Sequence, residues 1–243
     1  MLTTVRALLP HVFRASRKAP PVLCGVLALV LAVLPLAVSY RMEIPYAVTL
    51  IRVVSVTVAL GVAFALDDPA SPTTQVTPTS NLLVRLTRIA LSALPLVAVW
   101  LGALLLCRAA VPAEARPYLP VGGLALEATA LLVTTLAFAA VAVRVSAPTH
   151  GGLAAMPGLL LATTAVTLLP DDVQPFAGPG STRWDASRWF WLVLLVGAVV
   201  VLASLLGEAG HRRRRRSPAV AGPAAEQVPA TAEHEARSRR SVA

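Results

Sequence analysis

Six long apolar segments, separated by polar connections, dominate this sequence of 243 residues. A helix needs about 20 mainly apolar residues to cross a bilayer, and six such segments account for most of the chain. Every backbone N–H and C=O group in lipid needs a partner within the protein, so continuous apolar runs cross as helices. The sequence therefore predicts an all-α, polytopic integral membrane protein with six transmembrane helices. The segments are 21–40, 45–66, 89–107, 121–143, 153–169 and 187–206.

Composition excludes a water-soluble protein, because 56% of the residues are hydrophobic and only 14% are charged, against about 25% charged in soluble domains. A β-barrel is excluded because the apolar runs do not alternate with polar residues. We expect three regions: a basic N-terminal segment over 1–20, a six-helix transmembrane domain over 21–206, and a polybasic tail over 207–243.

Two of the six segments admit a second interpretation. The first follows Arg14, Arg17 and Lys18 and would also fit a signal peptide, but it is long, lacks a clear cleavage site and precedes further spans. The fifth is the shortest and contains Pro157 and Gly158. It fits either a full span or a broken helix buried among the others.

The distribution of Lys and Arg predicts the orientation, because positively charged loops stay in the cytoplasm. The N-terminal segment, the second and fourth connections and the tail together carry fifteen basic residues. The other side carries five, and the remaining one, Arg52, lies within a span. We expect a multi-pass protein of the bacterial cell membrane with both termini in the cytoplasm. The five are Arg41, Arg108, Arg116, Arg183 and Arg188.

Both ends of the chain are predicted to contact membrane lipids. Apolar residues from Val5 to Phe13 recur at helical spacing with basic residues opposite them, which indicates an amphipathic helix on the cytoplasmic leaflet. An ordinary basic leader that only sets topology is the alternative. A run of five arginines follows the last span and would be attracted to anionic lipids; nucleic-acid binding is not expected beside a membrane. The run is Arg212, Arg213, Arg214, Arg215 and Arg216.

The second connection, 67–88, is a candidate docking loop. It opens with Asp67 and Asp68 and continues through a Ser/Thr/Pro-rich stretch. Ser80 can cap a short surface helix with Leu86 and its apolar neighbours on one face and Arg85 and Arg88 opposite. A solvated connector without a partner is the alternative.

Arg52 and Glu127 are the two ionisable residues inside spans, and each costs a few kcal/mol unless it is paired or meets water. Counted from the outer ends of their segments at about 1.5 Å per residue, they lie about 10 Å and 9 Å deep. This matched depth permits a salt bridge. The pair either belongs to a substrate or proton path or locks two helices together.

Sequence motifs argue against an enzyme. The chain contains no G-x-x-x-x-G-K-[ST] motif for binding ATP, and no H-E-x-x-H or G-x-S-x-G motif. We expect no cofactor in this chain.

The basic N-terminal segment, six spans and the loop after the second span together resemble the permease subunit of an ABC-2-type exporter, over residues 1–206. The Ala65-Leu66-Asp67-Asp68-Pro69 junction resembles actinobacterial membrane proteins of ABC transporters. The resemblance implies a permease that pairs with itself or a second permease. It also implies a separate ATPase that binds the ATP and docks on 67–88. A secondary transporter that uses Arg52 and Glu127, and a non-transporting scaffold or assembly protein, are the alternatives.

The orientation yields a first prediction. A cytoplasm-specific reporter fused after Gly210 should be active, and the same reporter inserted within 170–186 should be inactive, because basic loops stay inside. An alkaline phosphatase reporter should give the opposite pattern. Cytoplasmic activity from the 170–186 insertion would contradict the six-span topology.

Overall fold

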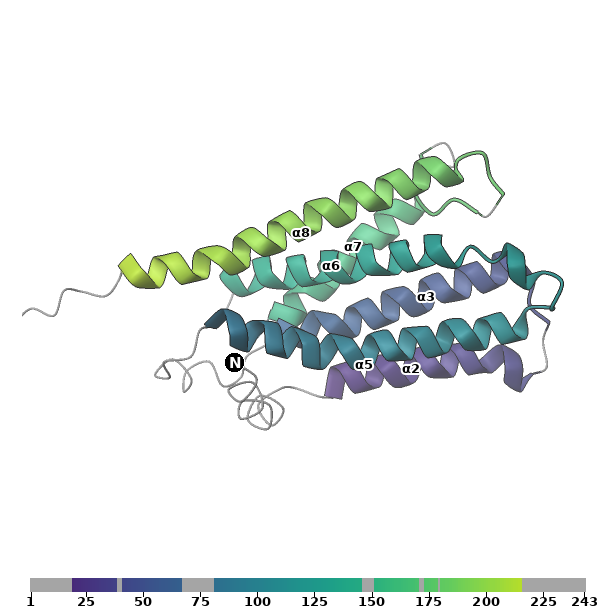
Figure 1. Ribbon diagram of the computed structural model, residues 1–243, viewed down its shortest axis with the longest axis horizontal. Coiled ribbons are helices and arrows are strands. Elements are labelled where there is room, and N and C mark those ends of the chain that lie inside the picture. Colours follow the sequence, from purple (N-terminus) through teal and green to yellow (C-terminus); the bar gives the residue numbers. More distant parts are fainter. Residues whose placement is uncertain are drawn as a thin grey trace, which may run out of the picture. The chain divides into compact units, whose positions relative to one another are not determined.

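The computed structural model describes residues 19–38, 41–66, 81–145, 151–170, 173–178 and 180–215, with backbone alone at 81–85, 151 and 206–215. The described part is helical and contains no strand (Figure 1). Two units are distinguished, and the packing below is that of the first, which ends at Ala209. The elements are α2 (Ala19–Ala37), α3 (Ile44–Ala63), η1 (Phe64–Leu66), α5 (Asn81–Ala110), η2 (Arg116–Tyr118), α6 (Val121–Val145), α7 (Gly151–Thr167) and α8 (Trp184–Arg215).

Five of these helices are long and apolar enough to cross a membrane: α2, α3, α5 from Leu86, α6, and α8 as far as Leu205. The expected helical membrane architecture is therefore present, with five candidate spans in the described residues. The sixth predicted span corresponds to α7, which has 17 residues. The expected amphipathic helix falls in residues 1–18, outside the described residues.

Helix α7 differs from the broken, buried helix that was one expectation for the fifth segment. It continues through Pro157 without interruption, since a proline removes a single backbone hydrogen bond and membrane helices can tolerate that loss. Ala155 and Leu159 are buried, whereas Leu160 and Leu161 are exposed. Only one side of α7 packs against the protein, so the helix lies at the edge of the bundle.

Helices α3 and α6 form the centre of the bundle. Buried residues make up 61% of the α3 span and 50% of the α6 span, against 22% or less in α2, α5 and α8. Helix α3 contacts α2, α5, α6 and α7. A side chain on the facing sides of α3 and α6 is therefore surrounded by protein, whereas most of the peripheral helices' apolar surface is left to lipid.

One end of the bundle gathers the ends of α2 and α5 and the beginnings of α3 and α6 (Figure 1). We call it the first-loop end, after the connection over 38–43. The amide of Met42 donates to the carbonyl of Ala110 across 3.2 Å. The Arg116 guanidinium donates to the carbonyls of Val111, at 3.0 Å, and Ala109, at 3.2 Å. A cation at this helix C-terminus complements the macrodipole of α5.

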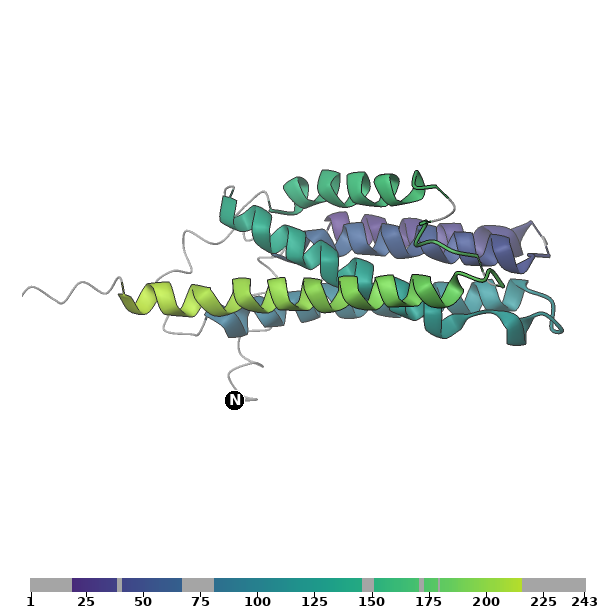
Figure 2. The ribbon, with the colours of Figure 1, turned by 90° about the horizontal axis from the view of Figure 1, so that it is seen from above.

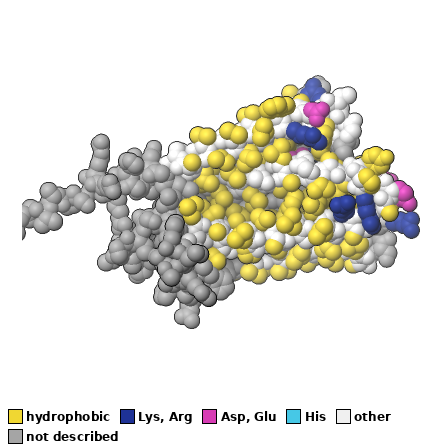
Figure 3. Space-filling view, in the orientation of Figure 1, with side chains coloured by type: hydrophobic (Ala, Val, Ile, Leu, Met, Phe, Trp, Pro, Cys, Tyr) yellow, Lys and Arg dark blue, Asp and Glu magenta, His cyan; other side chains and the backbone are white. Residues whose placement is uncertain are grey.

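Charged side chains gather toward the first-loop end on the face shown in Figure 3, while hydrophobic side chains cover much of the rest of the described part of that face. This distribution suits an apolar slab that meets a polar boundary at that end. The exposed charged residues there include Arg41, Glu43, Arg108, Glu114, Arg116, Arg183, Asp185 and Arg188.

Small residues allow α2, α3 and α5 to approach closely. Gly25, Ala28 and Ala32 form the buried side of α2. A Cβ atom added at Gly61 of α3 would lie 3.0 Å from both the Cys24 Cβ atom and the Leu96 Cδ1 atom. Gly61 is thus the point at which three helices meet, and small residues at such points bring membrane helices into van der Waals contact.

We predict that Gly61→Val destabilises the fold by about 1–3 kcal/mol, because the added methyl groups overpack this three-helix contact. The measurement is thermal unfolding of the detergent-solubilised protein followed by size-exclusion chromatography. Gly197→Val in α8 is the matched control, since no atom lies within 4 Å of a Cβ atom there. Equal losses in the two variants would contradict the packing argument.

Candidate functional site

The two ionisable residues that the sequence places inside spans lie on the two central helices. Arg52 is on α3 and Glu127 is on α6, each about two turns from its helix start. Since both helices begin at the first-loop end and run in the same direction (Figure 1), the two side chains reach the same depth. The sequence-derived depths therefore correspond to a real contact.

Arg52 and Glu127 form a two-point ion pair. The Arg52 Nε atom donates to Glu127 Oε2 across 2.8 Å, and Nη2 donates to Oε1 across 2.9 Å. Glu127 is only 3% exposed. Such a contact fixes both side chains more tightly than an ion pair from a lysine would, because the planar guanidinium and carboxylate form two parallel hydrogen bonds.

The remaining contacts of Arg52 come from the loop between α7 and α8. The Arg52 Nη1 atom donates to the Phe176 carbonyl across 3.0 Å, and Nη2 donates to the Ala177 carbonyl across 2.8 Å. The guanidinium carbon lies 5.2 Å from the centre of the Phe176 ring, within range of a cation–π contact. Arg52 thus joins α3, α6 and this loop.

We call residues 173–178 the α7–α8 strap. Figure 2 shows α7 and α8 lying apart, with the loop crossing between them. The strap is tied to α8 because the Pro175 carbonyl accepts hydrogen bonds from the Ser187 hydroxyl and, across 3.1 Å, from Trp191 Nε1. The Phe176 and Trp191 rings pack with their centres 5.0 Å apart.

Apolar residues surround this network. Ala59, Ala130, Leu131, Leu159 and Trp191 form one buried cluster, against which Phe176 packs. In such surroundings a charge without a partner is costly, so the four hydrogen bonds of Arg52 keep a neutral pair stable within the protein. Within the described residues, no group of three His, Cys, Asp or Glu side chains could hold a metal ion.

The structure covers little of the predicted docking loop. Asp67 and Asp68 lie outside the described residues, and Arg85 is described by its backbone alone, at the start of α5. Arg88 is buried at 6% exposure, whereas Leu86 is 47% exposed. Leu86 and Arg88 therefore lie on different faces of the helix, as expected, and the role of this loop in docking stays a prediction.

This orientation follows from the continuity of α5, which runs from Asn81 to Ala110 as one helix. Its first turns extend the lipid-facing side of the span, where Leu94 and Leu101 are also exposed. Leu86 continues that side, and Arg88 turns toward the bundle. Of the predicted lipid-anchoring arginines, Arg212 to Arg215 continue α8 as backbone only, and Arg216 lies outside the described residues.

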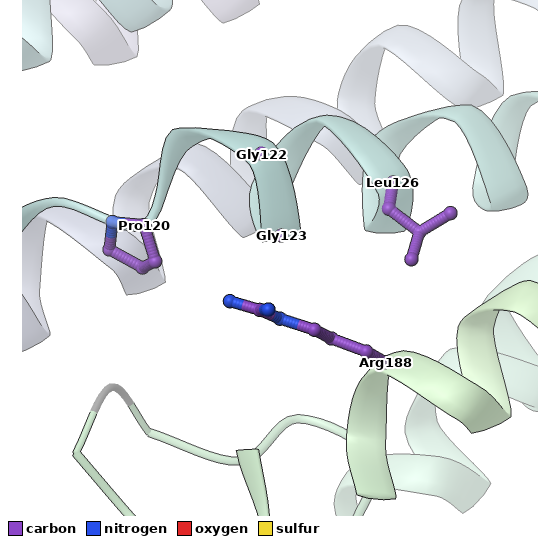
Figure 4. A pocket seen from close by; sticks show the side chains of 5 residues that line it. All are labelled: Pro120, Gly122, Gly123, Leu126 and Arg188. Carbon is purple, nitrogen blue, oxygen red and sulfur yellow. The ribbon is translucent and has the colours of Figure 1, made fainter. Parts of the chain in front are cut away.

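An open pocket of about 210 Å³ lies between the start of α6 and α8. In Figure 4 the Arg188 side chain extends into the space below Pro120 and Gly123. The guanidinium also lies 5.3 Å from the Trp184 ring centre and 3.8 Å from the Asp185 carboxylate. The sequence analysis considered Arg188 only for orientation, and it missed the strap entirely.

Comparison with protein-family models, with curated proteins and with solved structures finds no match to this chain.

We predict strong coupling between Arg52 and Glu127. Arg52→Met and Glu127→Gln should each destabilise the protein by about 3–5 kcal/mol, because each leaves a buried charge without its partner. The double variant should lose clearly less than the sum of the two. The measurement is a double-mutant cycle on thermal unfolding and on folded yield.

The exposed pair Arg188 and Asp185 supplies the matched control, since its side chains are 50% and 89% exposed. Arg188→Met and Asp185→Asn should each cost about 1 kcal/mol or less. Additive losses at Arg52 and Glu127 would refute their coupling.

Proposed function

We propose that this protein is the membrane-spanning permease subunit of an exporter that a separate ATPase drives. The observation that supports this is the ion pair of Arg52 and Glu127 between the two central helices. Apolar side chains of similar volume often hold helices together as well as a buried ion pair does. Intramembrane charges that are retained despite their cost are, by default, candidates for a transport path.

The shape of the network suits a closed state of such a path. Arg52 binds α3 to α6 through Glu127, and it binds the α7–α8 strap through two backbone carbonyls. Separation of the strap would break hydrogen bonds without leaving a charge unpaired, because the ion pair itself would persist. An outward opening at the first-loop end is therefore cheaper than a separation of α3 from α6.

The energy source is proposed from the sequence. The chain lacks an ATP-binding motif, and its resemblance to ABC-2 permeases implies an ATPase partner on residues 67–88 and a second permease. In this proposal both termini lie in the cytoplasm of a bacterial cell, and the first-loop end faces outward.

The complete pairing of Glu127 also suits a second candidate, a scaffold in which the network only locks helices together. A secondary transporter would instead use the same pair for coupling and need no ATP. Association with an ATPase separates the main proposal from both alternatives.

We predict that Asp67→Lys together with Asp68→Lys lowers co-purification of an ABC ATPase subunit from native membranes by about tenfold, equivalent to about 1.4 kcal/mol of binding free energy. Charge reversal at a docking surface replaces attraction by repulsion. The measurement is quantitative mass spectrometry of the ATPase, with membrane insertion checked by alkaline extraction.

Glu114→Lys is the control, because Glu114 is an exposed acid at the first-loop end, where the ATPase would not bind. Arg88 is unsuitable for this test because it is buried, so that a substitution there would change the stability of the fold as well as any contact with the ATPase. The proposal fails if the unaltered protein captures no nucleotide-binding subunit, and ATP-independent transport in vesicles would favour the secondary transporter.

A further inference from the structure

The α7–α8 strap occupies a binding position on Arg52 with its own backbone. Two N–H groups of the guanidinium, on Nη1 and Nη2, donate to the Phe176 and Ala177 carbonyls at 3.0 and 2.8 Å. The Phe176 ring lies against the guanidinium carbon at 5.2 Å. This position therefore has room for two neighbouring amide carbonyls, which accept hydrogen bonds from Arg52, and for one aromatic or apolar group.

The charge balance at this position selects for an uncharged ligand. Glu127 already neutralises Arg52 through its two hydrogen bonds. An entering carboxylate or phosphate would leave a net negative charge beside Phe176, which packs against the buried cluster of Ala59, Leu131 and Trp191, and burial of an unpaired charge is strongly unfavourable. A carbonyl oxygen of an amide or ester accepts the same hydrogen bonds without adding charge.

The strap's neighbours favour its exchange with such a ligand. Buried residues make up only 11% of the α8 span, and α7 packs along one side only. Among the described residues, hydrogen bonds link this part of the protein to the central pair at Arg52, which binds the strap, and at Arg144, which donates to the Leu205 carbonyl of α8. A ligand that replaces the two carbonyls compensates Arg52 fully, so strap release requires no unsatisfied donor.

We propose that Arg52 binds the transported molecule in place of the strap, and that this molecule is uncharged and apolar with neighbouring amide or ester carbonyls. This inference rests on the proposed transport function and specifies its substrate class. The strap then acts as a built-in competitor that fills the position until the ligand displaces it, and ligand binding shifts the population toward the open strap.

The test uses the full chain in liposomes, with N-acetyl-phenylalanyl-alaninamide as the probe, which carries the ring and carbonyls of Phe176 and Ala177. The reporter is the rate at which Ala177→Cys reacts with a membrane-impermeant maleimide. The unaltered chain, with its native Cys24 and Cys107, gives the background. The probe should raise the rate by roughly threefold or more, saturably, as it shifts the strap population.

Three controls sharpen the result. Gly178→Cys is exposed, and a Cβ atom there meets nothing within 4 Å, so its rate should not respond to the probe. Butylbenzene, which has a ring but no carbonyl, should leave the Ala177→Cys rate unchanged. Arg52→Lys keeps the charge but lacks the fork, so Ala177→Cys should already react quickly in that background and gain nothing from the probe.

An unchanged rate at saturating probe, an equal response to butylbenzene, or a slow rate in the Arg52→Lys background would each overturn the inference. Hydrogen exchange of the strap amides in the unaltered chain gives a second readout that needs no substitution, and the probe should accelerate it. Neither measurement involves ATP or transport. Their failure would leave the ATPase proposal to be judged by co-purification alone.

Discussion

The free-energy cost of a charge in an apolar interior governs the arrangement of this protein. Arg52 cannot reach water easily from its position on the central helix α3, so it has to find its partners within the protein. Glu127 supplies the opposite charge, and the strap supplies two carbonyl acceptors. The two central helices and the strap all contact this one guanidinium, and the strap connects it to Trp191 through the Pro175 carbonyl.

Much of the helical architecture could be predicted from the sequence because bilayer thickness sets the length of an apolar run. The five candidate spans fall within the predicted segments or extend them by a few residues. The matched depth of Arg52 and Glu127, which follows because helix rise converts residue number into distance, permitted the contact that the structure shows. Both successes depend on quantities that do not require knowledge of side-chain packing.

The strap could not be predicted, because its contacts with Arg52 are made by backbone carbonyls, which every residue carries. Nothing in the spacing of Phe176 and Trp191 along the sequence assigns them to the network of Arg52. The burial of Arg88 was missed for a related reason: a short surface helix and the first turns of a long span have the same local periodicity. Only the packing of α5 against its neighbours separates them.

The parallel course of α3 and α6 has a consequence for how the chain enters the membrane. Two helices that run in the same direction require the chain to return across the membrane between them, which α5 does here. Arg52 and Glu127 are therefore 75 residues apart in the sequence. At a synthesis rate of about 5–20 residues per second, Arg52 is made roughly 4–15 s before its partner. During that interval its long aliphatic stem has to hold the guanidinium near the interface. Until α6 and the strap are made, Arg52 therefore has neither the carboxylate nor the two carbonyls that it binds in the folded protein.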